Sequence, residues 1–504
     1  MMTGVIPAPF NLARYCLAPA VFASPGKTAL VVVGDADEPH TAERWTYAAL
    51  DEAVRRVAAG LLAEGLKPGD RLLLRLPNDS DYALLFLGAM AAGLVPIPVS
   101  TQLTDEEVAF LLADSSAAAL AQSSGPPYPA ACKLLGPAEI QAIKSASPLP
   151  GYADTAAESA AYMIYTSGTT SRPKGVLHAH RVILGREPMR RDWQGLGPND
   201  VMLHAGAFNW SYTLGVGMLD PWTAGATAVL YNGPKDIALW PKLIRAVGAT
   251  LFAAVPSLYR QILKYCAIDP ADLATLRHAL AAGESLSPAL LDQWRIATGK
   301  DLYDAFGMSE CSTFVSNGAG VPIRPGSPGR PQTGRRIAVL PLEGDPDPLP
   351  ANHTGLLAIH KDDPGLMLGY WRRPDEDERV SRGEWFAGGD LASFDDDGYL
   401  WHHGRADDIM NAGGFRVSPM EVEAALADCP GLAEVAVAER RVREDVSVIA
   451  AYVVRKPGEL SAETVLGHAE RRLAVYKRPR EVIFLDALPR SANGKLLRRQ
   501  LGST

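Results

Sequence analysis

Short apolar runs alternate with amphipathic stretches along most of the 504-residue chain. Residues 28–34 (TALVVVG) and 71–77 (RLLLRLP) have the length and the flanking turn residues of buried strands. Between them, residues 47–65 carry leucine and valine at helical spacing along one side. This alternation predicts an α/β fold with layered helices and largely parallel sheets. It continues downstream through residues 227–231, 241–247 and 251–255.

The pattern changes near residues 404–408, where shorter elements begin. A chain of this length exceeds one hydrophobic core, so two or three domains are expected. We predict a large N-terminal domain with several subdomains (1–405) and a small α+β C-terminal domain (408–504). The elements expected in the small domain are helices at 420–426 and 462–473 and strands at 435–438, 446–454 and 481–485.

Composition and charge narrow the class of protein. The chain is 47% hydrophobic and 21% charged, with a formal net charge of -8, which argues against nucleic acid as a primary partner. Its five cysteines are scattered without CxxC spacing, so neither a disulfide framework nor a zinc site is expected. The apolar run 83–99 is broken by glycine and proline, which favours a buried helix and strand over a membrane span. With no secretory leader visible, a cytoplasmic enzyme is expected.

Residues 165–180 (YTSGTTSRPKGVLHAH) combine hydroxyls, glycines and two cations without hydrophobic periodicity. Glycines let backbone N–H groups approach a phosphate, while hydroxyls and Lys174 add donors and charge. A Walker loop needs Ser or Thr after its lysine, and Gly175 stands there instead. The two interpretations are a flexible linker and an ordered anion-binding loop. The Pro173-Lys174-Gly175 ending before an apolar run favours the ordered loop.

YTSGTTSRPKG resembles the signature loop of the adenylate-forming superfamily, which includes acyl-CoA synthetases, luciferases and amino-acid adenylation domains. Ser171 departs from the glycine of most members, and it would be strained if the position needs a positive φ. Four further segments resemble family motifs in the same order: YDAFGMSE (303–310), GGD (388–390), GRADD (404–408) and PRSANGK (489–495). The whole most closely resembles medium-chain acyl-CoA and benzoate-CoA ligases.

The resemblance implies a role for each matching residue. Lys495 would be catalytic, bridging the carboxylate of the acid and the α-phosphate; Glu310 would be catalytic as the Mg²⁺ ligand; Asp390 and Arg405 would bind the ribose; and Asp407 would be the hinge about which a mobile C-terminal domain rotates. The phosphates would be bound by Thr166, Ser167, Gly168, Thr169, Thr170 and Lys174. Other nucleotide contacts would come from Gly283, Glu284, Ser285, Asp304, Ala305, Phe306, Gly307, Met308 and Ser309.

Two further segments concern the acceptor and the acid: residues 410–421 (MNAGGFRVSPME) for the acceptor of the acyl group, and residues 208–214 (FNWSYTL) for the acid. Gly413 and Gly414 would give a flat backbone edge for the pantetheine arm of coenzyme A. Arg416 would meet phosphate, although a surface ion pair is an equally good interpretation. Amino-acid adenylation domains carry an aspartate in the second segment that pairs with the substrate ammonium, whereas this chain has Asn209, so an α-amino acid is not expected. The same segment has no arginine to pair with the second carboxylate of a dicarboxylic acid. Residues expected to line the acyl pocket are Phe208, Asn209, Trp210, Gly283 and Gly307, whereas Trp222 fits the hydrophobic core better.

The expected function is therefore ATP-dependent ligation of an aromatic or short- to medium-chain monocarboxylic acid to coenzyme A through an acyl-adenylate. ATP, Mg²⁺ and coenzyme A are the implied cofactors. Three alternatives stay open: a ligase that loads a carrier protein, a non-catalytic nucleotide-binding module, and a luciferase-like oxygenase. The sequence does not choose between a monomer and a homodimer.

Overall fold

The computed structural model describes residues 6–125, 132–166, 173–234, 236–408, 410–412, 415–443, 446–490 and 496–501. Of residues 407, 411, 412, 415, 416, 443, 446 and 499, only the backbone is described. The chain forms two compact units, one of residues 1–336 and 360–379 and one of residues 337–359 and 380–504. Among the described helices, none combines the length and the hydropathy needed to cross a membrane.

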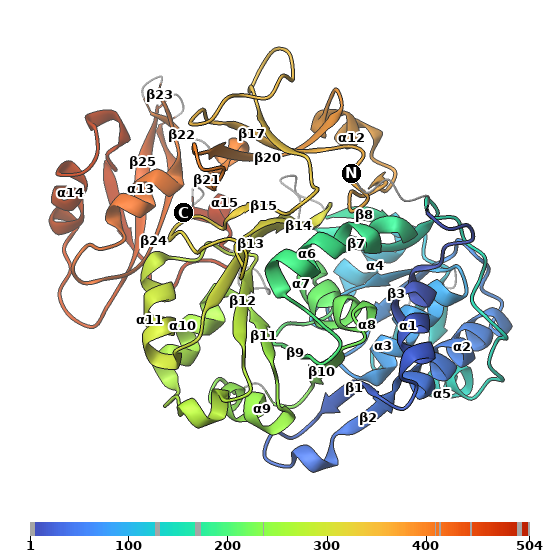
Figure 1. Cartoon of the computed structure of the whole chain (residues 1–504). Coiled ribbons are helices and arrows are strands. Elements are labelled where there is room, and N and C mark those ends of the chain that lie inside the picture. The colour runs from blue at the N-terminus through green and yellow to red at the C-terminus, as the bar shows by residue number, and fades with distance from the viewer. Residues whose placement is uncertain are drawn as a thin grey trace. The chain divides into compact units, whose positions relative to one another are not determined.

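A nine-stranded sheet forms the centre of the first unit (Figure 1), in the order β15-β14-β13-β12-β11-β9-β10-β1-β2. From β1 to β13 the neighbouring strands are parallel, and β2, β14 and β15 add antiparallel edges. The predicted α/β fold with largely parallel sheets is confirmed. The strands are β1 (Thr28–Val33), β2 (Glu43–Thr46), β9 (Val201–His204), β10 (Thr227–Tyr231), β11 (Leu251–Ala254), β12 (His278–Ala282), β13 (Leu302–Met308), β14 (Ser312–Ser316) and β15 (Arg330–Pro331).

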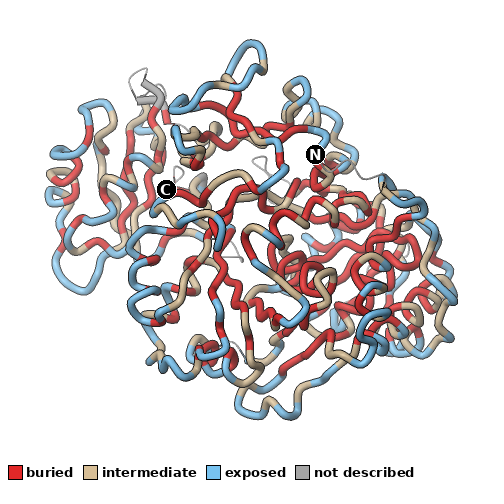
Figure 2. Tube along the Cα trace, viewed as in Figure 1, coloured by how far each residue is buried: buried red, intermediate tan, exposed pale blue. Residues whose placement is uncertain are grey.

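Both faces of this sheet are covered in its middle, and Figure 2 shows its central strands as largely buried. Successive side chains of a strand point to opposite faces, so Phe252 joins one buried cluster and Leu251 another. Helices α9 (Leu239–Val247), α10 (Pro256–Tyr265) and α11 (Pro288–Thr298) contribute to the first cluster. The second includes residues of α6 (Glu187–Met189), η3 (Arg190–Gln194), α7 (Ser211–Leu214) and η4 (Gly215–Leu219). Burial on both faces explains why these strands read as continuous apolar runs.

Two smaller sheets complete the first unit. A parallel sheet has the order β4-β3-β5-β6, and a second sheet has the order β18-β8-β7. The strands are β3 (Arg71–Arg75), β4 (Val95–Pro98), β5 (Ala119–Gln122), β6 (Lys133–Leu135), β7 (Ala160–Thr166), β8 (Lys174–Ala179) and β18 (Gly369–Tyr370). The helices are α1 (Leu12–Ala23), α2 (Tyr47–Ala63), α3 (Ser80–Ala91), α4 (Asp105–Ser115), α5 (Pro137–Lys144), α8 (Asp220–Thr223) and α12 (Pro374–Val380), and the 3₁₀ turns are η1 (Pro39–Thr41), η2 (His180–Arg186) and η5 (Pro270–Leu273). Every residue of α3 except Asp81 is buried, so the run 83–99 is a core helix followed by a strand, as predicted.

The second unit contains a five-stranded sheet and the small C-terminal module. The first sheet is made of β16 (Ile337–Leu340), β17 (Gly355–His360), β19 (Ser381–Arg382), β20 (Trp385–Phe394) and β21 (Leu400–Arg405). The module contains η6 (Ala406–Asp408), β22 (Met410–Ala412), β23 (Phe415–Val417), α13 (Pro419–Leu426), β24 (Leu432–Arg443), β25 (Val446–Arg455), α14 (Ala462–Glu470), η7 (Val475–Lys477), β26 (Glu481–Phe484) and α15 (Arg498–Leu501). The predicted order of helices and strands is confirmed, and β24 is longer than expected. Rotation of a 408–504 domain about Asp407 stays a prediction.

Candidate active site

Several predicted site residues lie at the carboxyl ends of the parallel strands of the nine-stranded sheet. Trp210 follows β9, Gly283 follows β12, and Phe306 lies in the last part of β13. Ala282 pairs with Ala305 in the β12–β13 register, so Gly283 and Phe306 are neighbours across the two strands. The carboxyl edge of a parallel sheet is the usual place for a ligand in α/β proteins. Two motifs far apart in sequence therefore converge on a typical ligand-binding edge.

Trp210 packs directly on the backbone of Gly283. Gly283 has φ +89°, and a Cβ at this position would lie 2.8 and 2.9 Å from the ring atoms Cζ2 and Cη2 of Trp210. Glycine is therefore required both for its conformation and for the close approach. The Trp210 ring also meets Tyr212 edge-to-face, with centroids 5.5 Å apart. These contacts give the strand edge an aromatic wall.

The segment predicted to bind the acid touches the segment predicted to bind the nucleotide. Ser211 Oγ, at the start of α7, lies 3.3 Å from Ser309 Oγ in the turn that follows β13. Gly307 permits this turn, because a Cβ there would be 2.3 Å from the carbonyl oxygen of Ser312 on β14. Phe306 is partly exposed and meets Phe314 edge-to-face at 5.7 Å. The turn thus presents an aromatic ring and a hydroxyl beside the segment predicted to bind the acid.

Glu310 and Lys174 are connected through Tyr370, a residue that sequence reasoning missed. The Tyr370 hydroxyl donates to Glu310 Oε1 at 2.8 Å, and Lys174 Nζ lies 5.0 Å from the centre of the Tyr370 ring. Lys174 Nζ is also 2.6 Å from Glu376 Oε2, and this lysine lowers the pKa of the Glu376 carboxyl. β18 brings Tyr370 here by pairing with β8, which begins at Lys174. No local sequence pattern indicated Tyr370 or Glu376, because their contacts span about 60 and 200 residues.

Glu310 has the chemistry of a magnesium ligand. One carboxylate oxygen accepts a hydrogen bond from the Tyr370 hydroxyl, and the residue is partly exposed. Within the described ranges, no three His, Cys, Asp or Glu side chains converge as a protein-built metal cage would require. Mg²⁺ is usually held by one or two carboxylates together with substrate phosphates and water. The residues present therefore fit Mg²⁺ carried in with a nucleotide.

In the second unit, the structure brings Asp390 and Arg405 together. They are direct partners in the β20–β21 register, and Arg405 Nη1 lies 3.5 Å from Asp390 Oδ2. His402 Nε2 is 3.0 Å from Asp390 Oδ1. Gly389, in the predicted GGD motif, has φ +90°, and a Cβ there would lie 2.9 Å from Arg405 Nη2. The carboxylate is therefore held in place by neighbours on its own sheet.

An aspartic acid, Asp304, and two histidines, His178 and His204, are buried in the first unit near the carboxyl edge of the nine-stranded sheet. Burial raises the pKa of Asp304 to about 7, and its side chain is buried within β13. Burial lowers the pKa values of His178 and His204 to about 3, so both rings are neutral at pH 7. Because both histidines are neutral and the aspartic acid is partly protonated, these three side chains add little charge to the interior of the first unit.

Other predicted residues have different surroundings. Phe208 is buried in the core, with its ring 5.2 Å from that of Tyr82. Both carboxylate oxygens of Glu284 accept hydrogen bonds from Ser257 at the start of α10, so this side chain holds the loop after β12. Trp222 is fully buried, and its Nε1 donates to the Ala29 carbonyl at 2.9 Å, as a core residue would. Asn209 is partly exposed. Thr166 is the last residue of β7 and pairs with Lys174 on β8. Ser285, Ala305 and Met308 are close in sequence to the residues described above.

The remaining predicted residues lie outside the described part of the chain. The predicted phosphate loop between β7 and β8 is described only at its two ends. Those outside are Ser167, Gly168, Thr169, Thr170, Ser171, Gly413, Gly414 and Lys495, together with the side chains of Asp407 and Arg416. Their roles stay predictions.

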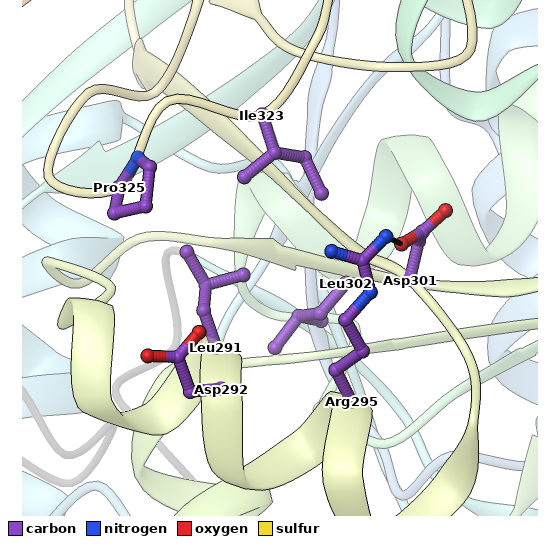
Figure 3. A pocket seen from close by; sticks show the side chains of 7 residues that line it. All are labelled: Leu291, Asp292, Arg295, Asp301, Leu302, Ile323 and Pro325. Carbon is purple, nitrogen blue, oxygen red and sulfur yellow. Dashed lines mark ion pairs between the residues drawn. The ribbon is translucent and has the colours of Figure 1, made fainter.

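A small hollow elsewhere on the first unit is distinct from this edge. Its volume is about 90 Å³, and it lies where α11 meets the beginning of β13, as Figure 3 shows. Arg295 and Asp301, two of the residues that line it, form an ion pair of 3.2 Å. Asp301 precedes β13, whereas the predicted site residues lie at the carboxyl ends of the strands. The hollow contains none of the predicted site residues.

Comparison with known proteins identifies the family. Residues 18–371 match the AMP-binding enzyme family, and residues 421–495 match the AMP-binding enzyme C-terminal domain. The chain is 31% identical over 493 residues to the 3-hydroxybenzoate–CoA ligase of Aromatoleum sp. (strain CIB), covering 93% of this chain and 94% of the relative. It is 32% identical over 483 residues to the benzoate–CoA ligase of Thauera aromatica, covering 91% and 90%.

A solved structure agrees with these sequence relatives. The anthranilate CoA ligase AuaEII in complex with anthranoyl-AMP superposes with a TM-score of 0.86 at 26% identity, covering 99% of this chain and 98% of that one. The resemblance drawn from five short motifs is thereby confirmed over nearly the whole chain. The chain belongs to the AMP-binding enzyme family.

Proposed function

We propose that this enzyme joins an aromatic monocarboxylic acid to coenzyme A through an acyl-adenylate. The chain is an AMP-forming acyl-CoA synthetase that uses ATP, Mg²⁺ and coenzyme A, since its relatives are CoA ligases along almost their full length. The observation that carries the proposal is the 3.3 Å contact between Ser211 and Ser309. It joins the segment predicted to bind the acid to the segment predicted to bind the nucleotide, and the proposed reaction requires a carboxylate and an α-phosphate to meet.

The proposed chemistry has two steps. A carboxylate oxygen of the acid attacks the α-phosphorus of ATP, the bond to the β-phosphate breaks, and pyrophosphate leaves. The thiolate of coenzyme A then attacks the acyl carbon, and AMP leaves with the electron pair of the broken C–O bond. Neither step needs a nucleophile from the protein, so the enzyme has to position the reactants and neutralise charge.

In this proposal, each described residue is assigned to one part of the nucleotide. Lys174 is assigned to the phosphates, which requires exchange of its present partner Glu376 for a phosphate oxygen. Glu310, oriented by Tyr370, is assigned to Mg²⁺, which supplies charge neutralisation when bound. Asp390 is suited to the two ribose hydroxyls because an ionised carboxylate accepts on two oxygens. Lys495 keeps the role that the family resemblance implies.

The aromatic class of acid is supported by the wall that the structure builds. Trp210 and Tyr212 meet edge-to-face, and the indole lies on Gly283 with no side chain in between. Flat aromatic surfaces suit a flat aromatic acid. The relatives reported above are named for benzoate, 3-hydroxybenzoate and anthranilate, which are aromatic acids with one carboxylate. No acidic side chain stands at Asn209 to favour an α-amino acid.

A pyrophosphate-release screen with purified enzyme tests the proposal. Benzoate, cyclohexanecarboxylate and hexanoate separate aromaticity from size and chain length, and each is assayed with and without coenzyme A. We expect kcat/KM to be highest for benzoate or a substituted benzoate, with AMP release dependent on coenzyme A. Equal or higher kcat/KM for the two aliphatic acids would refute the aromatic class. If AMP is released at the same rate with and without coenzyme A, the alternative of a ligase that loads a carrier protein is favoured.

A further inference from the structure

The turn that carries Glu310 contains a residue in an unusual backbone conformation. Ser312, at the start of β14, has φ +62°, in the left-handed region that non-glycine residues rarely adopt. Such a conformation costs of order 1 kcal/mol or more and persists only where surrounding contacts enforce it. Ser312 follows Glu310 by two positions, so its conformation helps to set the direction of the turn.

Arg186 supplies one of these contacts. Its Nε and Nη2 each donate to a different carboxylate oxygen of Asp220 at 2.7 Å, and its Nη1 donates to Ser312 Oγ at 2.5 Å. Arg186 is 2% exposed and Asp220 is fully buried. The guanidinium lies against the backbone of η4, where a Cβ on Gly215 would be 2.1 Å from Arg186 Nη2. The arginine therefore has one orientation, and that orientation fixes the Ser312 hydroxyl.

Arg335 supplies the second contact on the same turn. Its Nε and Nη2 donate to the two carboxylate oxygens of Asp363 at 2.9 and 2.8 Å. Its Nη1 donates to the Thr313 carbonyl at 2.7 Å, and Nη2 approaches the Cys311 carbonyl at 3.4 Å. Both members of this pair are buried as well. Two aspartate-anchored arginines thus hold three consecutive residues, 311–313, directly after Glu310.

We propose that Arg186 and Arg335 are positioning residues that aim the Ser309-Glu310 turn at the bound Mg²⁺ and nucleotide. The inference rests on the proposed role of Glu310 and adds what determines its direction. A planar guanidinium can satisfy a carboxylate and a third acceptor at once, which a lysine ammonium does with less geometric definition. Buried ion pairs contribute little net stability compared with apolar packing, so two of them on one turn point to positional control.

Ser312→Ala isolates the Arg186 arm. It removes the hydroxyl but keeps the Cβ and the Arg186–Asp220 pair. Ser312→Gly also removes the hydroxyl while relieving the backbone strain. Ser115→Ala is the matched control, since Ser115 Oγ makes a buried 2.6 Å hydrogen bond to the Leu111 carbonyl in α4, away from this turn. For the other arm, Arg335→Lys leaves a cation beside Asp363 that cannot reach both carbonyls.

Two measurements are made on each full-length variant. Hydrogen–deuterium exchange follows a peptide covering residues 304–316, and calorimetry follows ATP binding across a MgCl₂ titration without acid or coenzyme A. We expect both Ser312 variants to exchange faster in this peptide. We also expect their half-saturating Mg²⁺ concentration to rise about fivefold or more, corresponding to roughly 1 kcal/mol. Ser312→Gly should unfold at a temperature equal to or above that of Ser312→Ala, so the Mg²⁺ effect does not follow stability.

The outcomes separate this inference from the proposed function. If Ser312→Ala shows the same hydrogen–deuterium exchange and the same Mg²⁺ dependence as the wild type, the positioning role is overturned. It is also overturned if Ser115→Ala changes the two measurements as much as Ser312→Ala does. Glu310→Gln tests the underlying assumption: if it binds Mg²⁺ and ATP as the wild type does, the role of Glu310 is wrong. If Glu310→Gln loses the Mg²⁺ dependence and Ser312→Ala keeps it, only the positioning role fails. Arg335→Lys is expected to show the same two changes, and wild-type exchange and Mg²⁺ dependence in that variant overturn the role of Arg335; the Ser312 variants decide the role of Arg186.

Discussion

The contact between Trp210 and Gly283 gives a prediction about choice of acid. Gly283→Ala introduces a Cβ 2.8 Å from the indole, where carbon atoms normally lie about 3.5–4.0 Å apart. The ring therefore has to move by roughly 0.7–1.2 Å. Because Trp210 is only partly buried, its ring tip can move without disrupting the core. The main consequence should be a displaced aromatic wall.

Backbone strain has to be separated from this displacement. Alanine at φ +89° costs about 1–2 kcal/mol whatever surrounds it. Gly65→Ala is the matched control, because Gly65 has φ +90° and a Cβ added there would meet no atom of the described residues within 4 Å beyond its chain neighbours. Both variants should lose about 1–2 kcal/mol of unfolding free energy in urea. Only the loss beyond that of Gly65→Ala belongs to the indole.

Steady-state kinetics with the preferred acid completes the test. We expect Gly283→Ala to raise the KM for the acid about tenfold, equivalent to roughly 1.4 kcal/mol, and the KM for ATP by less than about threefold. Gly65→Ala should leave both values near those of the wild type. An unchanged KM for the acid, or equal changes in both KM values, would refute the placement of the acid beside Trp210.

Three further predictions follow from single residues. Lys174→Gln should raise the KM for ATP about tenfold through loss of one phosphate contact, with little change in the midpoint of thermal unfolding; an unchanged KM for ATP would contradict that role. Asp304→Asn should remove a pH dependence: a buried carboxyl with its pKa raised to about 7 costs stability as pH rises from 4 to 7, at most roughly 4 kcal/mol, so urea unfolding at pH 5 and pH 8 should differ less in the variant than in the wild type. Trp222→Phe should lose about 1–3 kcal/mol of stability with the hydrogen bond to Ala29, and an altered KM for the acid would show that Trp222 is not only a core residue.

Much of the fold was predictable because its signals are local. Strands β1, β3, β10 and β11 appear in sequence as apolar runs with turn residues at their ends, and α2 shows its buried face through spacing alone. A strand covered by helices on both faces has no polar alternation to obscure it. The same logic gave the elements of the C-terminal module. Their boundaries were less accurate, as β24 shows, because strand length depends on the partner strand.

The candidate site was predictable only where a motif is contiguous. Phe306 to Glu310 and Asp390 with Arg405 could be named because their residue order carries the chemistry. Tyr370 could not, since nothing near it in sequence indicates that β18 will pair with β8 and place its hydroxyl on Glu310. Burial also altered the expected surroundings of one residue: Phe208 packs against Tyr82, which comes from a helix far away in sequence.

By itself, the sequence determined the α/β class, the alternation of strands and helices, and the identity of the motifs that mark an adenylate-forming enzyme. The tertiary structure decided which side chains meet: Trp210 on Gly283, Ser211 beside Ser309, Lys174 with Glu376, and two buried arginines on the turn after Glu310. The physical reason is range. Backbone preferences and hydrophobic periodicity act over a few neighbouring residues, whereas these contacts depend on sheet order and on the packing of segments up to about 200 residues apart.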